Sequence, residues 1–285
     1  MQVFHDIAKI PDLIRCDATG QGSIFDADTV RAKNLRTRHP SNRKREFAIL
    51  ITTAAQRRLT PRARGMSQEQ IRRKIIELGP WFHQIEIAGL GTRTIAPAPG
   101  PQPADHPRTR WSVLERSIPT DLTGMRVLDV GCADGFFALE LAKRGAHVTA
   151  IDHSGLAIRR LDWLIAELGI TQITTRVAKF EKLGISNERY DFALMIALLY
   201  HLRSPMNAFD VMSKLTDKIY VETVVHEKNE APYLYLEPPV EGVHRVPKWM
   251  PTEKCVLDML CFAGFSRIKI LDRAAPRRGI YVAEK

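Results

Sequence analysis

Cysteine is scarce in this sequence, and long apolar runs are missing from it. The four cysteines, at positions 16, 132, 255 and 261, include no Cys-x-x-Cys pair. We therefore expect neither a disulfide framework nor a zinc site, and no other metal site is indicated. No apolar stretch is long enough to span a bilayer, and the N-terminus lacks the pattern of a signal peptide. These absences favour a soluble, cytoplasmic protein with reduced thiols.

Positive charge is concentrated in one segment, from Arg31 to Lys74. Fourteen basic residues and two acidic ones give this segment a charge of +12 in a chain of net charge +10, so the remainder is close to neutral. A basic segment beside a near-neutral domain is typical of proteins that bind polyanions such as RNA. The alternative is a solvated helical face, and the segment has few aromatic residues that could stack on bases.

The most informative stretch is an apolar run that ends in a glycine turn. Arg126 to Val130 shows no polar alternation, as expected of a buried parallel strand. The motif Asp129-x-Gly131-x-x-x-Gly135 follows, and then an amphipathic helix over residues 136–144. Glycines at 131 and 135 let the backbone turn sharply and come close to a ligand. A strand, a glycine turn and a helix together predict a nucleotide-binding crevice at the carboxyl end of a sheet.

A second acidic residue lies where a ribose-binding carboxylate belongs. Asp152 ends the next apolar strand, 21 residues after Gly131, and could accept both ribose hydroxyls. Turn capping and packing would explain a glycine pair alone, but with Asp152 in place we favour ligand binding. Asp129 occupies the position of the first glycine in the dinucleotide fingerprint, where a carboxylate would repel phosphate. The pattern therefore suits a nucleoside that carries a positive charge.

This hydrophobic-Asp-x-Gly pattern resembles motif I of the class I S-adenosylmethionine-dependent methyltransferases. The resemblance covers about residues 120–285 and implies an α/β fold, a Rossmann-like seven-stranded sheet with helices on both faces. A closing antiparallel pair at 268–271 and 280–283 is typical of that sheet and not of a dinucleotide dehydrogenase.

Two regions are expected, with a boundary near residue 115. Residues 1–115 would form a basic, mainly helical N-terminal extension, and residues 116–285 the S-adenosylmethionine-binding domain. Within the extension, residues 43–59 could form an amphipathic helix, and Ser67-x-x-Gln70 is a capping box for a clearer one. A proline-rich connector at 96–107 shows neither helical nor strand pattern.

Three segments narrow the resemblance. Pro80-Trp81-Phe82-His83, His106-Pro107-x-x-x-Arg110-Trp111 and Leu198-Leu199-Tyr200-His201 are similar to the bacterial tRNA (mo5U34)-methyltransferase-like family, over roughly residues 67–285. Members of that family act on the 5-hydroxyl of the wobble uridine, either by methylation or by carboxymethylation from carboxy-S-adenosylmethionine. Other relatives have unknown or small-molecule substrates.

The resemblance implies a set of cofactor-side residues beyond the motif residues Asp129 and Gly135. They are Gly131, Asp152, His153 and Ser154 around the nucleoside, Phe180, Glu181 and Ile196 at the adenine, and Arg110, Trp111 and Tyr200 around the sulfonium and the transferred group. Carboxymethyl-transferring members have a lysine two residues after the tryptophan, where this chain has His83. Plain methyl transfer from S-adenosylmethionine is therefore favoured.

Trp81 and His83 could wall the acceptor pocket, although a buried tryptophan is more often plain packing. A sulfonium methyl is already activated, so the protein mainly aligns the acceptor, an effect that can supply ~7–11 kcal/mol. A hydroxyl acceptor must also lose its proton, and His201 is a candidate base that could equally be a structural histidine. Tyr200 could orient the acceptor, and Glu222 is another possible base.

The expected function is methyl transfer to a hydroxyl or similar nucleophile. The acceptor would be a tRNA wobble uridine, with segment 31–74 gripping the tRNA, or a small molecule of specialised metabolism. A basic binding protein with a vestigial cofactor fold is disfavoured, because the cofactor-side residues look intact.

Overall fold

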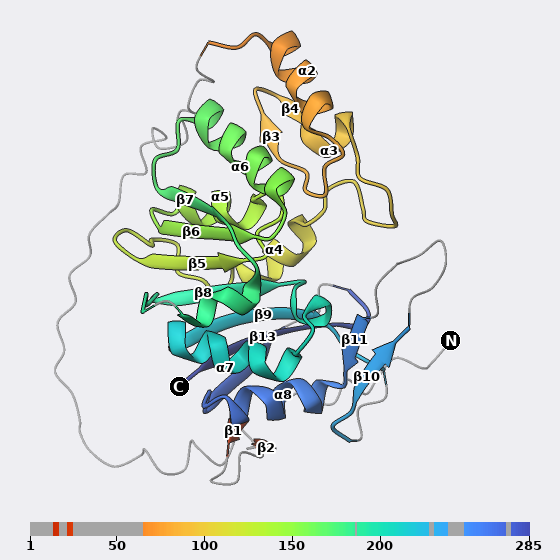
Figure 1. Ribbon diagram of the computed structural model, residues 1–285, viewed down its shortest axis with the longest axis vertical. Coiled ribbons are helices and arrows are strands. Elements are labelled where there is room, and N and C mark those ends of the chain that lie inside the picture. The colour runs from red at the N-terminus through yellow and green to blue at the C-terminus, as the bar shows by residue number, and fades with distance from the viewer. Residues whose placement is uncertain are drawn as a thin grey trace, which may run out of the picture.

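The computed structural model describes residues 14–16, 22–24, 65–185, 187–227, 231–238, 248–271 and 275–285. Within these residues a mixed sheet of nine strands runs in the order β2-β1-β12-β13-β9-β8-β5-β6-β7 (Figure 1). The central strands are parallel: β5 (Arg126–Val130), β6 (His147–Asp152), β7 (Ile173–Val177), β8 (Phe192–Ile196) and β9 (Lys218–Val224). The others pair antiparallel: β13 (Arg278–Glu284), β12 (Arg267–Leu271), β1 (Ile14–Cys16) and β2 (Gly22–Ile24).

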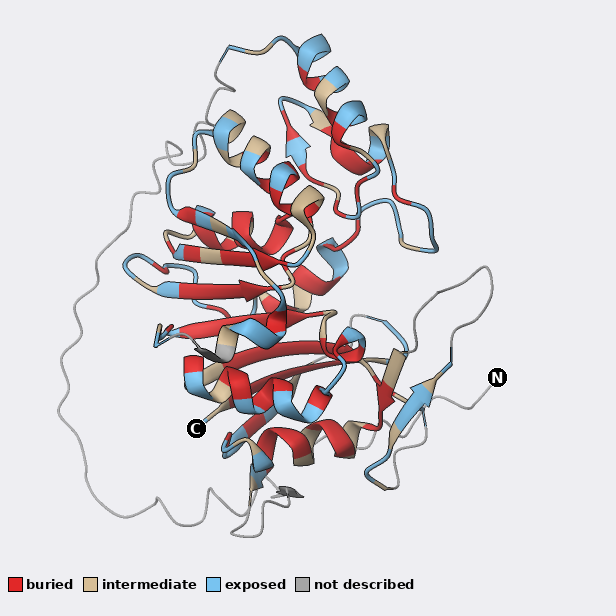
Figure 2. Ribbon diagram, in the orientation of Figure 1, coloured by how far each residue is buried: buried red, intermediate tan, exposed pale blue. Residues whose placement is uncertain are grey.

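Helices cover both faces of this sheet, and the central strands are therefore apolar on both sides. In β8 all residues are buried; Phe192, Leu194 and Ile196 pack into one core cluster, and the intervening residues pack into the other. The alternation follows from strand geometry, because successive side chains point to opposite faces. The first cluster includes residues of α5 (Phe136–Lys143) and α6 (Gly155–Leu168), and the second includes residues of α7 (Pro205–Leu215) and α8 (Glu253–Phe262). Figure 2 shows the central strands as mostly buried between them.

The expected Rossmann-like α/β fold is confirmed, including the closing antiparallel pair β12–β13. Helix starts follow the predicted chemistry. The Ser154 side chain caps α6 by accepting a hydrogen bond from the backbone N–H of Ala157, and Ser67 with Gln70 forms the expected capping box of α2 (Gln68–Leu78). Thr252 caps α8 in the same way.

The segment before the sheet shares a core with it. This segment contains α2, the short strands β3 (Glu86–Ile87) and β4 (Leu90–Gly91), α3 (Thr92–Ile95) and α4 (Arg108–Leu114). Ile75 and Trp81 belong to the same buried cluster as Phe136 of α5. The boundary near residue 115 stays a prediction, because hydrophobic packing continues across it. The helix expected over residues 43–59 lies outside the described residues.

The proline-rich connector is held in place by one arginine. The Arg93 guanidinium donates to the backbone carbonyls of Gln102 and Pro103, at 2.8 and 3.2 Å, and approaches the carbonyl of Trp81 at 3.4 Å. Arg93 is itself buried. The connector therefore lies against the body of the protein, an arrangement that its irregular sequence did not predict.

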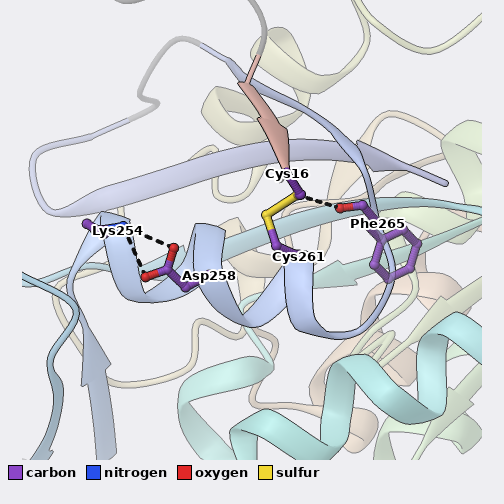
Figure 3. Close-up of a disulfide and its surroundings, with 5 residues drawn as sticks. All are labelled: Cys16, Lys254, Asp258, Cys261 and Phe265. Atoms are coloured by element: carbon purple, nitrogen blue, oxygen red, sulfur yellow. Dashed lines mark hydrogen bonds and ion pairs between the residues drawn. A yellow bond between two sulfur atoms is a disulfide. The ribbon is translucent and has the colours of Figure 1, made fainter. Parts of the chain in front are cut away.

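One prediction about the N-terminal region is corrected, and one arrangement was not predicted. Residues 14–16 and 22–24 form short strands, and β1 extends the sheet by pairing with β12. Cys16 forms a disulfide with Cys261 of α8 (Figure 3), although no disulfide was expected. The partners are 245 residues apart in sequence, so only the docking of β1 beside the C-terminal elements brings them together. Spacing rules based on nearby cysteines miss such a pair.

A separate two-stranded sheet, β10 (Leu234–Glu237) and β11 (Lys248–Pro251), was not expected. It lies near the carboxyl end of β9, at the right in Figure 1. A hydrogen bond of 2.8 Å from the His226 N–H to the Pro251 carbonyl ties it to the loop after β9. β11 contacts the 3-10 turn η2 (Leu199–His201) that follows β8. Among the described helices, none has the length and apolarity required to cross a membrane.

Candidate active site

The glycine turn after β5 is fixed to the tip of β6. The backbone N–H groups of Gly131 and Cys132 both donate to the carbonyl of Ile151, at 2.8 and 3.1 Å. Gly131 has φ +75°, and a Cβ there would lie 3.2 Å from Leu198, so a side chain would meet both strain and a neighbour. The backbone can therefore come close to a ligand at this turn.

Asp152 ends β6 and faces the same turn. Its carboxylate accepts hydrogen bonds from the backbone N–H groups of Ala133, at 3.0 Å, and Ser154, at 2.8 Å. Each carboxylate oxygen has a further lone pair, so the fixed group can still accept ribose hydroxyls. His153 lies beside it, 3.2 Å from Oδ1, and is mostly exposed. The structure thus brings Gly131, Asp152, His153 and Ser154 together, as expected for a nucleoside site.

Asp129 lies fully buried beneath the turn, and its Oδ2 atom has no hydrogen-bond partner among the described residues. Burial and the negative charge of Asp152 raise its pKa to about 7, against a backbone hydrogen bond from Ala138 that lowers it. A buried, incompletely bonded carboxyl group beside a second carboxylate favours a cationic ligand. Asp129 and Asp152 therefore fit a positively charged nucleoside such as S-adenosylmethionine.

The predicted adenine-side residues lie at the neighbouring strand ends. Phe180, which is buried, and Glu181, which is exposed, begin the turn η1 (Phe180–Ile185) after β7, and Ile196 ends β8. A hydrogen bond of 2.9 Å from the Ala178 N–H to the Asp152 carbonyl joins this region to the tip of β6.

At β9, two arginines share one buried glutamate. Glu222 of β9 is fully buried; Arg110 of α4 approaches it at 3.1 Å and Arg278 of β13 at 3.3 Å. The Arg278 guanidinium also lies over the ring of Tyr200, 5.3 Å from its centroid. Burial lowers the pKa of Arg278, but the charge of Glu222 and the contact with Tyr200 outweigh it and raise that pKa. All three side chains are therefore held in fixed positions.

His201 lies next to Tyr200, with ring centroids 4.2 Å apart, but it is exposed whereas Tyr200 is buried. Trp111 is buried beside Phe136 and Phe137 of α5. Trp81 is fully buried, and its indole N–H donates to the Ile75 carbonyl at 2.8 Å. The structure gives Trp81 the packing role that the sequence had left open.

His83 is a neutral group in this structure. Its Nδ1 atom accepts a hydrogen bond from the backbone N–H of Phe136, 3.3 Å away. Burial, then the charges of Arg110 and Arg93, lower its pKa to about 3. His106 contacts Arg110 at 3.1 Å, and burial and that arginine lower its pKa to about 3 as well. Neither imidazole carries a charge near neutral pH.

A buried ion pair that the sequence did not reveal positions His83. The Asp134 carboxylate accepts from the backbone N–H groups of Phe82 and His83, at 2.6 and 2.9 Å, and pairs with Arg160 of α6 at 2.9 Å. Arg160 in turn donates to the Leu78 carbonyl at 2.7 Å. This network fixes the segment after α2 on the glycine turn, and its partners are too far apart in sequence for a motif to show it.

A cavity of about 310 Å³ opens beside Tyr200, and most of its lining was missed by sequence reasoning. Tyr200 borders it together with side chains from the end of β9, the start of β13 and the β10–β11 pair; the lining includes Val224, Glu237, Lys248, Met250, Arg277 and Arg278. The one local signal in the sequence for this lining is the adjacent pair Arg277 and Arg278 at the start of β13. The rest comes from a strand pair whose partners are far apart in sequence.

Comparisons with known proteins bear on the fold and the reaction. A family model described as a methyltransferase domain matches residues 127–218. The magnesium-protoporphyrin O-methyltransferase of Rhodobacter capsulatus is 31% identical over 182 residues, 62% of this chain and 77% of that protein. The tRNA U34 carboxymethyltransferase of Ectopseudomonas mendocina (strain ymp) is 27% identical over 170 residues, 58% of this chain and 52% of that protein. The chain spans about half the length of several curated relatives that it matches.

Among solved structures, the N-terminal domain of EvdMO1 with SAH bound has the same fold. Its TM-score is 0.63 at 20% identity, with 77% of this chain and 97% of that chain covered. The glycine turn between the strand tips that carry Asp129 and Asp152, the order of strands in the sheet and these relatives all indicate the same family. The chain belongs to the class I S-adenosylmethionine-dependent methyltransferases, resembles the tRNA (mo5U34)-methyltransferase-like family, and uses S-adenosylmethionine as its cofactor.

Proposed function

We propose that the protein transfers a methyl group from S-adenosylmethionine to a hydroxyl or similar oxygen nucleophile held in the cavity beside Tyr200. One observation carries this proposal. The cavity opens at Tyr200, directly after β8, and β8 is the parallel neighbour of β5, whose tip carries Asp129 and the glycine turn. In sheets of this type, ligands bind at the carboxyl ends of neighbouring strands, so cofactor and acceptor would meet there.

The bound cofactor supplies a methyl group on a positively charged sulfur. In the proposed mechanism Asp152 holds the nucleoside, Asp129 faces its positive charge, and the Gly131 turn lets the backbone approach. Tyr200, fixed under Arg278, orients the acceptor oxygen, and the surrounding buried side chains exclude water. Glu222 fixes Arg110 and Arg278, and we keep His201 as the candidate base for a neutral hydroxyl.

Transfer of a plain methyl group is favoured over carboxymethyl transfer. His83 occupies the position at which the carboxymethyl-transferring relatives have a lysine. Because burial and the neighbouring arginines hold its pKa at about 3, His83 cannot pair as a cation with a carboxylate on the cofactor near neutral pH.

The first acceptor that we propose is the 5-hydroxyl of a tRNA wobble uridine. The three family motifs and the similarity to a tRNA U34 carboxymethyltransferase support it. The basic segment 31–74 would contact phosphates, although most of it lies outside the described residues. At its described end Arg73 and Lys74 pair with Glu69 and Glu77.

The second candidate is a small molecule. The chain forms the cavity from its own strands, and the relative of which it covers the larger share is a magnesium-protoporphyrin O-methyltransferase. Incubation with methyl-labelled cofactor and either bulk tRNA or a metabolite extract separates the two. Label in tRNA that falls steeply between low and moderate salt supports the first, whereas label in a small product with little salt dependence supports the second. Label in neither would contradict the proposed transfer.

A further inference from the structure

Among the described residues that line the cavity beside Tyr200, positive charges outnumber negative ones. The charged members of this described lining are Lys248, Arg277, Arg278 and Glu237. Glu237 and Lys248 are direct register partners in the β10–β11 pair, so Glu237 offsets one of the three positive charges. Within the described part of the chain, the acid in ion-pair contact with Arg278 is Glu222, which Arg110 also shares. One buried carboxylate thus balances two guanidinium groups.

Arg277 lies at the same wall of the cavity. Its backbone has φ +60°, a conformation that is uncommon for a residue with a side chain. The Arg277 carbonyl accepts from the Val225 N–H at 2.9 Å, and its Nη2 atom lies 3.5 Å from the Met250 sulfur. Its pairing with Glu227 is loose, at 3.8 Å between two largely exposed side chains. The guanidinium therefore lies beside Met250 and is only weakly neutralised.

Among the described residues around the cavity, few groups could take a proton from a neutral acceptor. Glu222 is enclosed between two arginines. His201 does not line the cavity, and the two buried histidines near Arg110 are too acidic when protonated to serve as bases at neutral pH. Glu237 is the direct register partner of Lys248 in the β10–β11 pair.

From this arrangement we infer that the acceptor reaches the cavity as an oxyanion, a carboxylate or an ionised acidic enol or phenol, held by Arg277, Arg278 and Lys248 beside Tyr200. The inference rests on the proposed function and specifies its substrate class. In the transfer a lone pair of the oxyanion forms the new C–O bond while the C–S pair returns to sulfur. The products are a neutral methyl ester or ether and S-adenosylhomocysteine, and no proton has to move.

The test measures anion binding and needs no known acceptor. Isothermal calorimetry on the full chain saturated with S-adenosylhomocysteine would compare benzoate with its neutral analogue benzamide. We expect benzoate to bind at least tenfold more tightly than benzamide. Arg277→Gln and Lys248→Gln should each weaken benzoate about tenfold, because each removes a charge-assisted contact. Affinity for S-adenosylhomocysteine should stay the same, and so should benzoate binding in the control Arg267→Gln, which changes an exposed arginine of β12.

Equal binding of benzamide, no measurable benzoate binding, or benzoate affinity unchanged in both cavity variants would overturn the inference. Competition between benzoate and S-adenosylhomocysteine would overturn it as well, since the anion would then lie on the cofactor side. None of these results would contradict the proposed methyl transfer, provided that S-adenosylhomocysteine binds. Failure of S-adenosylhomocysteine to bind would instead contradict the proposed function.

Discussion

At the scale of single residues, the buried carboxyl group of Asp129 makes the stability of the fold depend on pH. Its pKa in the folded chain, about 7, lies above the ordinary value of 3.8, so the folded state binds this proton more tightly than the unfolded state does. Stability linked to Asp129 is therefore present at low pH and is lost as pH rises from about 4 to about 7. The loss is at most about 4 kcal/mol, at 1.36 kcal/mol per pKa unit.

Asp129→Asn should remove this dependence. We expect the free energy of unfolding of the variant to exceed that of the wild type by more at pH 8 than at pH 5, as measured by urea denaturation. Affinity for S-adenosylmethionine should fall at least tenfold, because the positively charged sulfur loses a facing carboxylate. The exposed Asp210→Asn is the matched control and should change neither quantity. A constant difference between the two pH values would show that Asp129 does not titrate in this range.

The variant Glu222→Gln tests whether Glu222 holds Arg110 and Arg278 in place or acts as the base. An amide in place of the carboxylate leaves Arg110 and Arg278 without their buried counter-charge, and breaking such a pair costs about 3–5 kcal/mol. We therefore expect a large drop in melting temperature. Glu284→Gln, which disrupts partly exposed pairs with Lys218 and Arg267, should cost about 1 kcal/mol or less. Lost turnover at an unchanged melting temperature would instead favour Glu222 as the base.

The sequence indicated site residues where the signal was local. Asp129, Gly131 and Asp152 follow from a short motif and a fixed spacing to the next strand tip. The partners of Asp134 and Glu222 could not be found this way. Each of these acids pairs with an arginine that sits on an element distant in sequence, and no single-sequence pattern records that proximity.

At the scale of secondary-structure elements, the parallel strands were predictable because their apolar runs are continuous. Caps of α2 and α6 followed from side-chain chemistry. The β10–β11 pair was not predictable from the sequence, because its strands are short and include exposed apolar residues such as Tyr235 and Leu236. Hydrophobic alternation is lost in such strands. The proposed acceptor cavity is lined partly by that pair, and this explains why most of its lining was not found from the sequence.

Two glycine variants, Gly135→Ala and Gly155→Ala, test whether the junction of the glycine turn and α5 can accept a side chain. Gly135 has φ +89°, and a Cβ there would collide with Leu161 of α6. Gly135→Ala should therefore cost at least ~1–2 kcal/mol in the free energy of unfolding. Gly155, the first residue of α6, has no positive φ, and its nearest neighbour to a new Cβ lies 3.8 Å away. Gly155→Ala should be neutral or stabilising by up to about 1 kcal/mol. Equal effects on urea denaturation would mean that the turn relaxes around a side chain.

At the scale of the whole molecule, segments from before the core motif attach to opposite ends of the sheet. Near the β7 end, the Asp134–Arg160 pair joins the α2 segment to the glycine turn. At the β12 end, β1 extends the sheet and is linked to α8 by the Cys16–Cys261 disulfide (Figure 3). The first attachment belongs to the active site, and the second lies on the far edge, so the two should be separable by experiment.

The disulfide should stabilise the fold without contributing to cofactor binding. A cross-link between such distant residues restricts the unfolded chain, and removal of a native disulfide typically costs 2–4 kcal/mol, about several degrees in melting temperature. We expect dithiothreitol to lower the wild-type melting temperature to that of Cys261→Ala, and the variant itself to be insensitive to reductant. Affinity for S-adenosylhomocysteine should be equal in all three samples, since neither cysteine approaches the strand tips that carry Asp129 and Asp152. Cys255→Ala, at a free cysteine of the same helix, controls for packing loss and should keep the response to reductant. If dithiothreitol leaves the wild-type melting temperature unchanged, β1 is held by its hydrogen bonds to β12 and not by the cross-link.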